Sequence, residues 1–456
     1  MSEYTHSVFI FRRDLRLQDN TGLLQALATS QQVIPCFIFD PAQIRPHRYQ
    51  SRPGYQFMVE SLLDLDQQLA AHNSRLAVFF DKPERALESL ITRMKVQAVF
   101  VNRDYSPFSI RRDQKLSRLC RTHNVDFNSC HDALLIEPEF ALKKDQTPYT
   151  VFTPFYRNAR QYRVDDVQQL QGGRFYQQRV GQSLKKVMAQ LDHPDNYDLR
   201  SGRHSALEIL KDLGDFRDYE RQRDFPSHQG TTLLSAHNKF GTCSIREVYH
   251  AIEKTLGTDH ALLRELYWRD FFTHIAFHFP HVFGHAFRRQ YDAIPWSNSR
   301  SWFNRWCNGE TGFPIVDAGM RELNQTGYMH NRVRMIVASF LVKDLNIDWR
   351  WGERYFARHL VDYDPCVNNG NWQWAASTGC DAQPYFRIFN PWLQQKRFDA
   401  DCRYIKRWVA ELKDYTAKQI HHWDQNAGGS DYPSPLVDHA EQASVSKATY
   451  KPVVST

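Results

Sequence analysis

Apolar residues follow two periodicities in the first 130 residues of the chain. Short uninterrupted apolar runs are typical of strands buried on both faces of a parallel sheet, and the chain has four of them: SVFIF at 7–11, VIPCFIFD at 33–40, LAVFF at 76–80 and QAVFV at 97–101. Between these runs, MVESLLDLDQQLAAH and ERALESLITRMK repeat apolar residues every three or four positions, as amphipathic helices do. The alternation predicts an open α/β domain with a Rossmann-like parallel sheet over residues 1–130.

The pattern changes after residue 130. Residues 131–205 are polar and rich in Gln, which predicts a long interdomain connection with some helix in it. Helical periodicity prevails over 206–423 and strand-like runs become scarce, so we expect an all-helical second domain there. Residues 424–456 are rich in Ser, Ala, Asp and Pro, and we expect a loosely packed C-terminal tail.

Two of the expected helices have a face with fewer charged residues than a fully solvent-exposed face would have. In HNRVRMIVASFLVKDL, at 330–345, an apolar stripe lies opposite a face made of Asn331, Arg334, Met335 and Ala338. In RELYWRDFF, one face holds Glu265, Trp268, Arg269 and Phe272. These faces suit a cavity for a flat, polar ligand, although an exposed Glu–Arg pair beside a core Trp is the simpler interpretation of the second segment alone.

Three other segments each have a functional and a structural interpretation. In GTTLLS, at 230–235, hydroxyl and N–H groups could bind phosphate oxygens, but helix capping explains the sequence equally well. His278, His281 and His285 lack an HExxH pattern and an acidic partner, which favours core or surface histidines over a metal site. RRDLR, at 12–16, is interpreted as a solvated strand end and not as a nucleic-acid patch.

Composition and charge limit the classes of function. A formal charge of +7 over 456 residues is compatible with a polyanionic partner, but it is weak support for one. The eight cysteines show no CxxC or regular spacing, so we expect reduced thiols in a cytoplasmic protein and no metal. No apolar stretch approaches about 18 residues, so we expect no membrane insertion. All eleven tryptophans lie between Trp268 and Trp423, which suggests a task for this half of the chain beyond core filling.

Several ordered motifs together identify a family. They are FIFRRDLRLQDNTGL, YERQRDFPSHQGTT, TGYMHNRVRMIVASFLVKDL, IDWRWGERYF, NNGNWQWAASTG and PYFRIFNP. Over nearly its whole length the chain resembles the DNA photolyase/cryptochrome family, and within it the class I cyclobutane pyrimidine dimer photolyases. The resemblance implies an N-terminal α/β domain, a helical domain that holds FAD, and a deoxyribodipyrimidine photo-lyase. Such an enzyme repairs dimers in UV-damaged DNA by electron transfer from light-excited, reduced FAD.

The resemblance also assigns cofactor residues. The positions that match the family's FAD site are Tyr219, Thr231, Thr232, Leu233, Leu234, Ser235, Arg269, Arg334, Asp362, Asp364 and Asn368. Thr231, Thr232 and Ser235 match the stretch that holds the phosphates. Asp362 and Asp364 match acids facing the ribityl and isoalloxazine parts, with Arg334 as counter-ion. Asn368 matches the residue beside flavin N5, where a neutral amide hydrogen-bonds without adding charge.

Further positions match the substrate and electron-transfer residues of the family. Those implied to contact the dimer are Glu265, Trp268, Asn331, Met335 and Trp374. Those implied to carry electrons to the surface are Trp372, Trp349 and Trp296. Those implied to meet DNA phosphates are Arg223, Arg332 and Arg387.

Departures from the family pattern leave alternatives open. Leu233 stands where many relatives have Arg, and Thr150 where close relatives have Lys. NRDYSPFSIRRD, at 102–113, lacks the Asn-Glu-type pair of a folate antenna site. The second chromophore is therefore methenyltetrahydrofolate, 8-hydroxy-deazaflavin or absent. A cryptochrome photoreceptor, a (6-4) photolyase and a non-enzymatic lesion-binding flavoprotein are the alternative functions. Family habit implies a monomer without an obligate protein partner.

Overall fold

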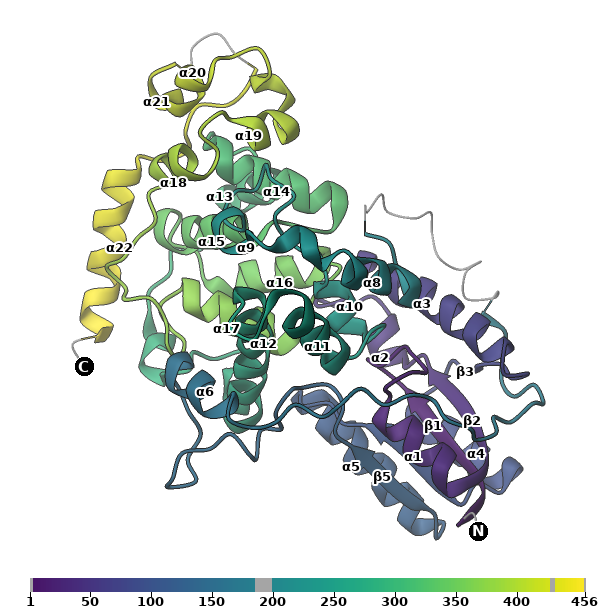
Figure 1. Cartoon of the computed structure of the whole chain (residues 1–456). Helices are drawn as coiled ribbons and strands as arrows, with labels where there is room; N and C mark the ends of the chain where they lie inside the picture. Colours follow the sequence, from purple (N-terminus) through teal and green to yellow (C-terminus); the bar gives the residue numbers. More distant parts are fainter. Residues whose placement is uncertain (1–2, 185–198, 427–430, 455–456) are drawn as a thin grey trace. The chain divides into compact units, whose positions relative to one another are not determined.

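The computed structural model describes residues 3–184, 199–426 and 431–454 (Figure 1). Contacts divide these residues into two compact units. Unit 1 contains 3–184, 199–215 and 233–278, and unit 2 contains the remaining described residues, 216–232 and 279 onwards. Helices just after residue 232, which the sequence places in the second domain, therefore cluster with the sheet.

Unit 1 is built on a five-stranded parallel sheet with the order β3-β2-β1-β4-β5. The strands are β1 (Tyr4–Phe11), β2 (Ser30–Ile38), β3 (Ala77–Phe79), β4 (Ala98–Asn102) and β5 (Asp126–Cys130). Val8 of β1 pairs with Ile34 on one side and with Val99 on the other. Because these three side chains are buried, the central strands have the continuous apolar runs that predicted them.

Helices connect the strands, and the periodicity predicted two of them, α3 and α4. They are α1 (Thr21–Thr29), α2 (Pro41–Ile44), α3 (Arg52–Ala70), α4 (Pro83–Met94) and α5 (Pro107–Thr122). Several begin at side-chain caps; for example, Ser51 Oγ accepts a hydrogen bond from Gly54 N at the start of α3.

The rest of unit 1 comprises a connecting chain and a group of helices. The connecting chain follows the sheet, since Gln182 N donates to Val78 O of β3 at 2.7 Å and Tyr176 N donates to Val33 O of β2 at 2.8 Å. The helices are α6 (Phe152–Ala159), α8 (Gly202–Lys211), α10 (Ser235–Phe240), α11 (Ile245–Leu256) and α12 (Ala261–His278). The 3-10 turn Leu213–Phe216 follows α8, and its last residue belongs to unit 2.

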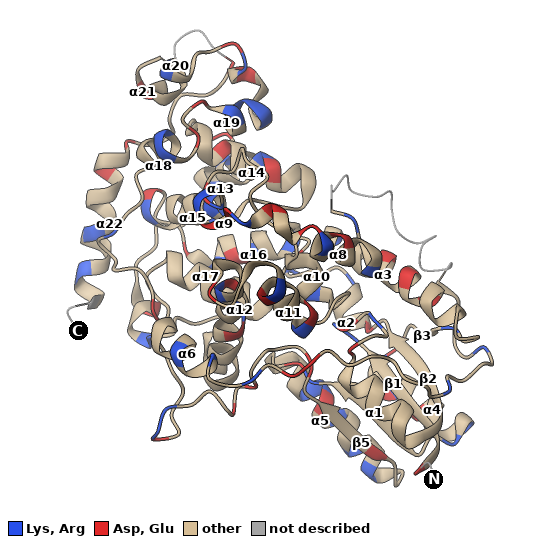
Figure 2. Ribbon diagram, in the orientation of Figure 1, with Lys and Arg blue, Asp and Glu red and all other residues tan. Residues whose placement is uncertain are grey.

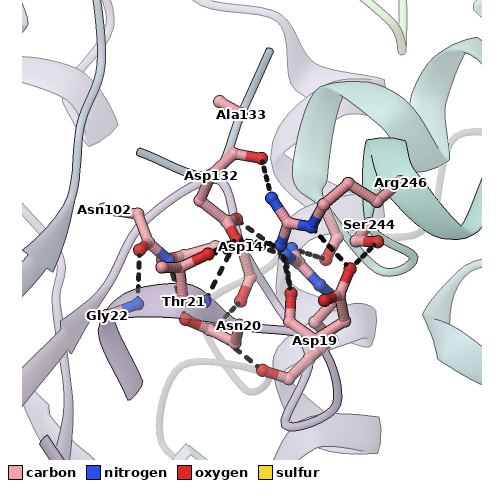
Figure 3. A network of polar contacts seen from close by, with 12 residues as sticks. Asp14, Asp19, Asn20, Thr21, Gly22, Asn102, Asp132, Ala133, Ser244 and Arg246 are labelled. Carbon is pink, nitrogen blue, oxygen red and sulfur yellow. Dashed lines mark hydrogen bonds and ion pairs between the residues drawn. The ribbon is translucent and has the colours of Figure 1, made fainter. Parts of the chain in front are cut away.

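Buried charges fill the region beyond the carboxyl ends of β1 and β4 (Figure 3). Asp132 accepts from Arg16 at 2.6 Å and from Arg246 at 2.8 Å, and Asp19 accepts from Arg246 at 3.0 Å. Asn102 donates to Asp14 at 2.6 Å. Burial raises the pKa of Asp132, but the two guanidinium groups more than offset this and lower it to about 2.

This network corrects the interpretation of RRDLR as a solvated strand end. Arg16 is only 1% exposed, and Arg12 and Arg13 pair with Asp113 at 2.8 Å and Asp104 at 3.5 Å. The arginines bind carboxylates far away in the sequence, which their local sequence does not reveal.

Unit 2 is all-helical in its described part. Its α-helices are α9 (Tyr219–Gln222), α13 (Arg300–Asn308), α14 (Pro314–Thr326), α15 (Asn331–Ser339), α16 (Trp349–His359), α17 (Pro365–Ala375), α18 (Pro391–Phe398), α19 (Arg403–Trp408), α20 (Ala417–His421), α21 (Trp423–Asn426) and α22 (His439–Val454). The π-helical turn η4 (Phe340–Asp344) continues α15, and 3-10 turns occupy Pro280–Val282, Arg289–Ala293 and Ala410–Leu412. The sheet of unit 1 and the helices of unit 2 confirm the predicted fold class.

The C-terminal segment corrects the expectation of a loosely packed tail. It forms α22, whose Tyr450 is fully buried and donates its hydroxyl hydrogen to Ala376 O at 2.6 Å. His439, at the start of α22, pairs with the buried Asp344 of η4. Average composition does not reveal the few buried residues that attach an otherwise polar helix. Of the helices in the described part of the chain, none has both the length and the apolar content needed to cross a membrane.

Candidate active site

Three of the expected site residues follow one another at four-residue intervals, with Asp364 as the N-cap of α17 and with Asn368 and Trp372 about one turn apart within the helix. Asp364 caps the helix, because its Oδ1 accepts from Cys366 N at 2.9 Å and from Val367 N at 3.1 Å. Asn368 is buried, and its Nδ2 donates to Glu353 O of α16 at 3.1 Å. The capping carboxylate and the α16 carbonyl together fix where the Asn368 amide lies.

The neighbouring amides explain much of the polar, uncharged sequence NNGNWQWAASTG. Asn369 Nδ2 donates to Val282 O at 3.0 Å and to Glu353 Oε1 at 3.1 Å. Gln373 Nε2 donates to His285 O at 3.1 Å and to Asn369 Oδ1 at 3.0 Å. These buried amides attach α17 to the 282–285 segment and to α16, a positioning task that sequence reasoning did not assign to them.

Two of the predicted flavin residues of unit 2 form an ion pair. Arg334 of α15 donates to both carboxylate oxygens of Asp362, at 3.1 and 2.9 Å, and its Nε donates to Met329 O at 2.7 Å. Burial lowers the pKa of Arg334, but the Asp362 carboxylate and other groups more than offset this and raise it. The guanidinium of Arg334 is therefore charged.

Tryptophans from distant positions gather in the core of unit 2. Trp349 and Trp372 are buried within one apolar cluster, and Trp296 and Trp374 pack against it, partly exposed. Trp306, which we did not predict as a site residue, meets the ring of Trp372 edge-on at 6.3 Å. Gly352 makes room for Trp372, since a Cβ at that position would lie 2.1 Å from the indole ring. Of the three residues expected to carry electrons, Trp372 and Trp349 are therefore buried and Trp296 is partly exposed.

The apolar stripe predicted for α15 is confirmed. Its apolar stripe, which comprises Val333, Ile336, Val337 and Phe340, is buried. On the other side Asn331 is exposed and Met335 is partly exposed. His330 caps α15 by accepting from Arg332 N at 3.2 Å, and burial followed by the charge of Arg334 lowers its pKa to about 4. His330 is therefore neutral at physiological pH.

The three arginines expected to meet phosphates differ in surroundings. Arg332 pairs with Asp224 at 2.7 Å and lies 4.4 Å from the ring centroid of Phe398. Arg223 lies 5.6 Å from the ring centroid of Tyr219, and Arg387 is exposed. Figure 2 shows further Lys and Arg residues on the neighbouring helices α18 and α19.

In unit 1, Glu265, Trp268 and Arg269 are all partly exposed on α12. The indole of Trp268 stacks on Phe152, with ring centroids 3.5 Å apart and planes at 6°. Arg269 Nη1 donates to Ala133 O at 2.7 Å, so this guanidinium holds the chain that follows β5.

The loop GTTLLS begins in unit 2 and ends in unit 1, with the division after Thr232. Thr231 hydrogen-bonds the hydroxyl of Tyr328. Leu233 is 38% exposed and has a φ of 57°, a left-handed conformation that is unfavourable for a branched apolar residue. Helix α10 begins at Ser235 without a side-chain cap, so capping does not account for this sequence.

The three histidines considered for a metal site bind other groups. His278 and His281 hydrogen-bond Pro138 O at 3.0 Å and Phe287 O at 3.1 Å, and His285 pairs with Asp292 at 3.1 Å. In the part of the chain that the structure describes, no group of three or more His, Cys, Asp or Glu residues is arranged to hold a metal ion.

Comparisons with known proteins identify the family. Residues 7–171 match the family model described as DNA photolyase, and residues 262–452 match the one described as the FAD binding domain of DNA photolyase. The chain is 36% identical over 469 residues to a deoxyribodipyrimidine photo-lyase of a Synechococcus species, a match that covers 97% of this chain and 96% of the relative.

Solved structures agree with these matches. The archaeal photolyase of Sulfolobus tokodaii, described with two FAD molecules, is 44% identical with a TM-score of 0.89, covering 98% of this chain and 100% of that one. A bacterial class III photolyase of Agrobacterium tumefaciens is 36% identical with a TM-score of 0.91, covering 99% and 98%. The expected enzyme class, deoxyribodipyrimidine photo-lyase, and the expected cofactor, FAD, are confirmed. The chain therefore belongs to the DNA photolyase family.

Proposed function

We propose that the protein repairs cyclobutane pyrimidine dimers in DNA, as class I photolyases do. The observation that carries this proposal is the neutral amide of Asn368, which is buried on α17 behind the Asp364 cap and is held by Glu353 O. Reduced FAD, when bound and excited by light, supplies the electron that splits the dimer.

The donor groups present suit that cofactor. In unit 2, the hydroxyls of Thr231 and Thr232 would bind the phosphates with Tyr219, and in unit 1 Leu233, Leu234, Ser235 and Arg269 would contribute backbone and side-chain donors. The Arg334–Asp362 pair and Asp364 would face the ribityl and ring portions. Asn368 would hydrogen-bond the flavin ring without adding a charge to it.

The residues near His330 favour a cyclobutane dimer over a (6-4) photoproduct as substrate. Asn331 stands where (6-4) photolyases of the family typically have a second histidine, and its amide would hydrogen-bond pyrimidine carbonyls. His330 is neutral and already caps α15, so at physiological pH it is not an imidazolium that could act as a general acid. Glu265 would also hydrogen-bond the dimer, while Met335, Trp268 and Trp374 would pack against it.

DNA would be held mainly through its phosphates. Arg387, which is exposed, and Arg223 would contribute most, because the charge of Arg332 is already shared with Asp224. We also propose a monomeric cytoplasmic protein without an obligate partner, which sedimentation of the purified holoprotein would test.

Repair of defined lesions tests the proposal. The purified, reduced holoprotein is given duplex DNA with a thymine cyclobutane dimer or a (6-4) photoproduct, in blue light and in the dark. We expect light-dependent reversal of the cyclobutane dimer only. Reversal of the (6-4) photoproduct, or binding of lesions without reversal in light, would contradict the proposed substrate.

The Sulfolobus tokodaii relative suggests a third candidate for the second chromophore. Because that protein is described with two FAD molecules and a novel light-harvesting cofactor, we propose FAD as an antenna here too. Mass spectrometry of the released cofactors, with the ratio of FAD to protein, tests this. Two FAD per chain is expected, whereas a folate or a deazaflavin beside one FAD would contradict it.

A further inference from the structure

One of the two ring faces of Trp268 is stacked on an aromatic side chain of unit 1. The Phe152 ring lies parallel to the indole, with a centroid distance of 3.5 Å and an interplanar angle of 6°. Phe271 meets the indole edge-on at 5.8 Å, and Phe272 lies at 5.6 Å and 28°. Trp268 is nevertheless partly exposed, so its contact with any ligand must use the opposite face or the ring edge.

Phe152 is itself held by several contacts. It is the first residue of α6, which lies beside α12 (Figure 1), and it is 1% exposed. Its ring stacks on Tyr156 at 5.7 Å and 12°, and meets Phe271 edge-on at 5.7 Å. The guanidinium of Arg264 lies 5.6 Å from the Phe152 ring centroid. The plane of Phe152 is therefore fixed by α6 and α12, and it fixes the plane of Trp268 in turn.

We propose that Phe152 is a positioning residue for lesion recognition, which sets the plane of the Trp268 indole and so favours a flipped dimer over normal DNA. The inference rests on the proposed function, in which Trp268 is an aromatic wall for the dimer. A cyclobutane dimer presents saturated ring edges and methyl groups at a fixed angle, so the orientation of one flat wall affects how much surface it buries. Undamaged DNA stays stacked and does not reach that wall.

Phe155 provides a matched control, because it is another buried aromatic residue of α6. Its ring contacts Phe271 at 5.4 Å and His274 at 4.9 Å. If Phe152 only filled the core, Phe152→Leu and Phe155→Leu would have similar effects.

The test measures dark binding of the FAD-loaded holoprotein to a labelled duplex with one thymine dimer and to the same duplex undamaged. We expect Phe152→Leu to weaken dimer binding about tenfold, the order of one lost aromatic stack, without changing affinity for undamaged DNA. Phe152→Tyr, which keeps the flat ring, should bind like the wild type, and Phe155→Leu should keep its preference for the dimer.

A double-mutant cycle isolates the contact. In a Trp268→Phe background, Phe152→Leu should have a much smaller effect on dimer binding. FAD content and melting temperature are measured for each variant, and Phe152→Met replaces Phe152→Leu if the latter does not retain FAD. Equal losses in Phe152→Leu and Phe155→Leu, or an undiminished effect in the Trp268→Phe background, would overturn the inference alone. A wild-type protein that does not prefer the dimer would refute the proposed function, and the inference with it.

Discussion

Lys343 carries an ammonium group that is buried in unit 2 without an ion pair in the described part of the chain. Its side chain lies in η4 and is 1% exposed. Nζ donates to Ser377 Oγ at 3.0 Å and lies 3.7 Å from the ring centroid of Tyr450 on α22. Burial lowers the pKa of Lys343 from 10.5 to about 7.

The cost of this burial can be worked out from the two pKa values. Their difference corresponds to about 5 kcal/mol, at about 1.36 kcal/mol for each pKa unit. The cation–π contact with Tyr450 offsets about 2 kcal/mol, and the hydrogen bond to Ser377 about 1 kcal/mol. We therefore expect Lys343→Met, which keeps the unbranched stem, to raise the free energy of unfolding by about 2 kcal/mol at pH 7.

The same reasoning predicts a pH dependence. Between pH 7 and 10.5 the unfolded chain binds more protons at Lys343 than the folded chain does. Stability therefore rises with pH in this window, and it is lost as pH falls through 7. Lys343→Met should remove this rise.

Urea unfolding at pH 6, 7, 8 and 9, followed by tryptophan fluorescence, measures both effects. Ten of the eleven tryptophans lie in unit 2, so this signal reports on the unit that contains Lys343. Lys413→Met at an exposed position is the control and should change stability by less than about 0.5 kcal/mol. A lower urea midpoint for Lys343→Met at pH 7, or an unchanged pH slope, would refute the reasoning.

Three further predictions concern other contacts. Gly352→Ala places a Cβ 2.1 Å from the Trp372 ring and should lower the free energy of unfolding by about 1–3 kcal/mol. Gly214→Ala is the control, because a Cβ there has nothing within 4 Å, and it should leave the thermal melting temperature unchanged. Asn368→Asp loses the hydrogen bond to Glu353 O and adds a buried charge, so FAD content and the rate of photoreduction should both fall. Asn371 is exposed, and Asn371→Asp should change neither measurement. The pKa of Asp132 is lowered from 3.8 to about 2, which corresponds to a contribution of about 2.5 kcal/mol to the free energy of unfolding. This contribution is lost as pH falls through that range. In acid titrations followed by circular dichroism, the stability of Asp132→Asn should therefore depend less on pH between pH 4 and 2 than that of the wild type.

Local pattern was enough to predict most of the elements. The apolar runs predicted β1, β2, β3 and β4 because these strands are buried by helices on the sheet, and three- and four-residue spacing predicted α3 and α4. β5 was missed, since its sequence DFNSC is polar and it pairs only with β4 at the edge of the sheet. The α22 helix was missed because its few anchors, such as Tyr450, are diluted by polar residues.

Contacts at long range could not be predicted from local pattern. The sequence suggested polar faces on α12 and α15, and the family resemblance supplied individual roles for their residues. Neither indicated that Glu353 would hold both Asn368 and Asn369, because α16 and α17 meet only in the folded chain. The need for glycine at 352 likewise depends on where the Trp372 ring packs.

The buried network around Asp132 has a consequence for how the chain folds during synthesis. Asp19 and Asp132 leave the ribosome early, but Arg246, which pairs with both, follows Asp132 by 114 residues. At translation rates of about 5–20 residues per second, this interval lasts roughly 6 to 23 seconds. During that time the nascent sheet has all five strands but holds carboxylates without their full set of cations. The sheet therefore reaches its final stability only when α11 has been synthesised, and a chain that ends near residue 205 would keep that deficit permanently.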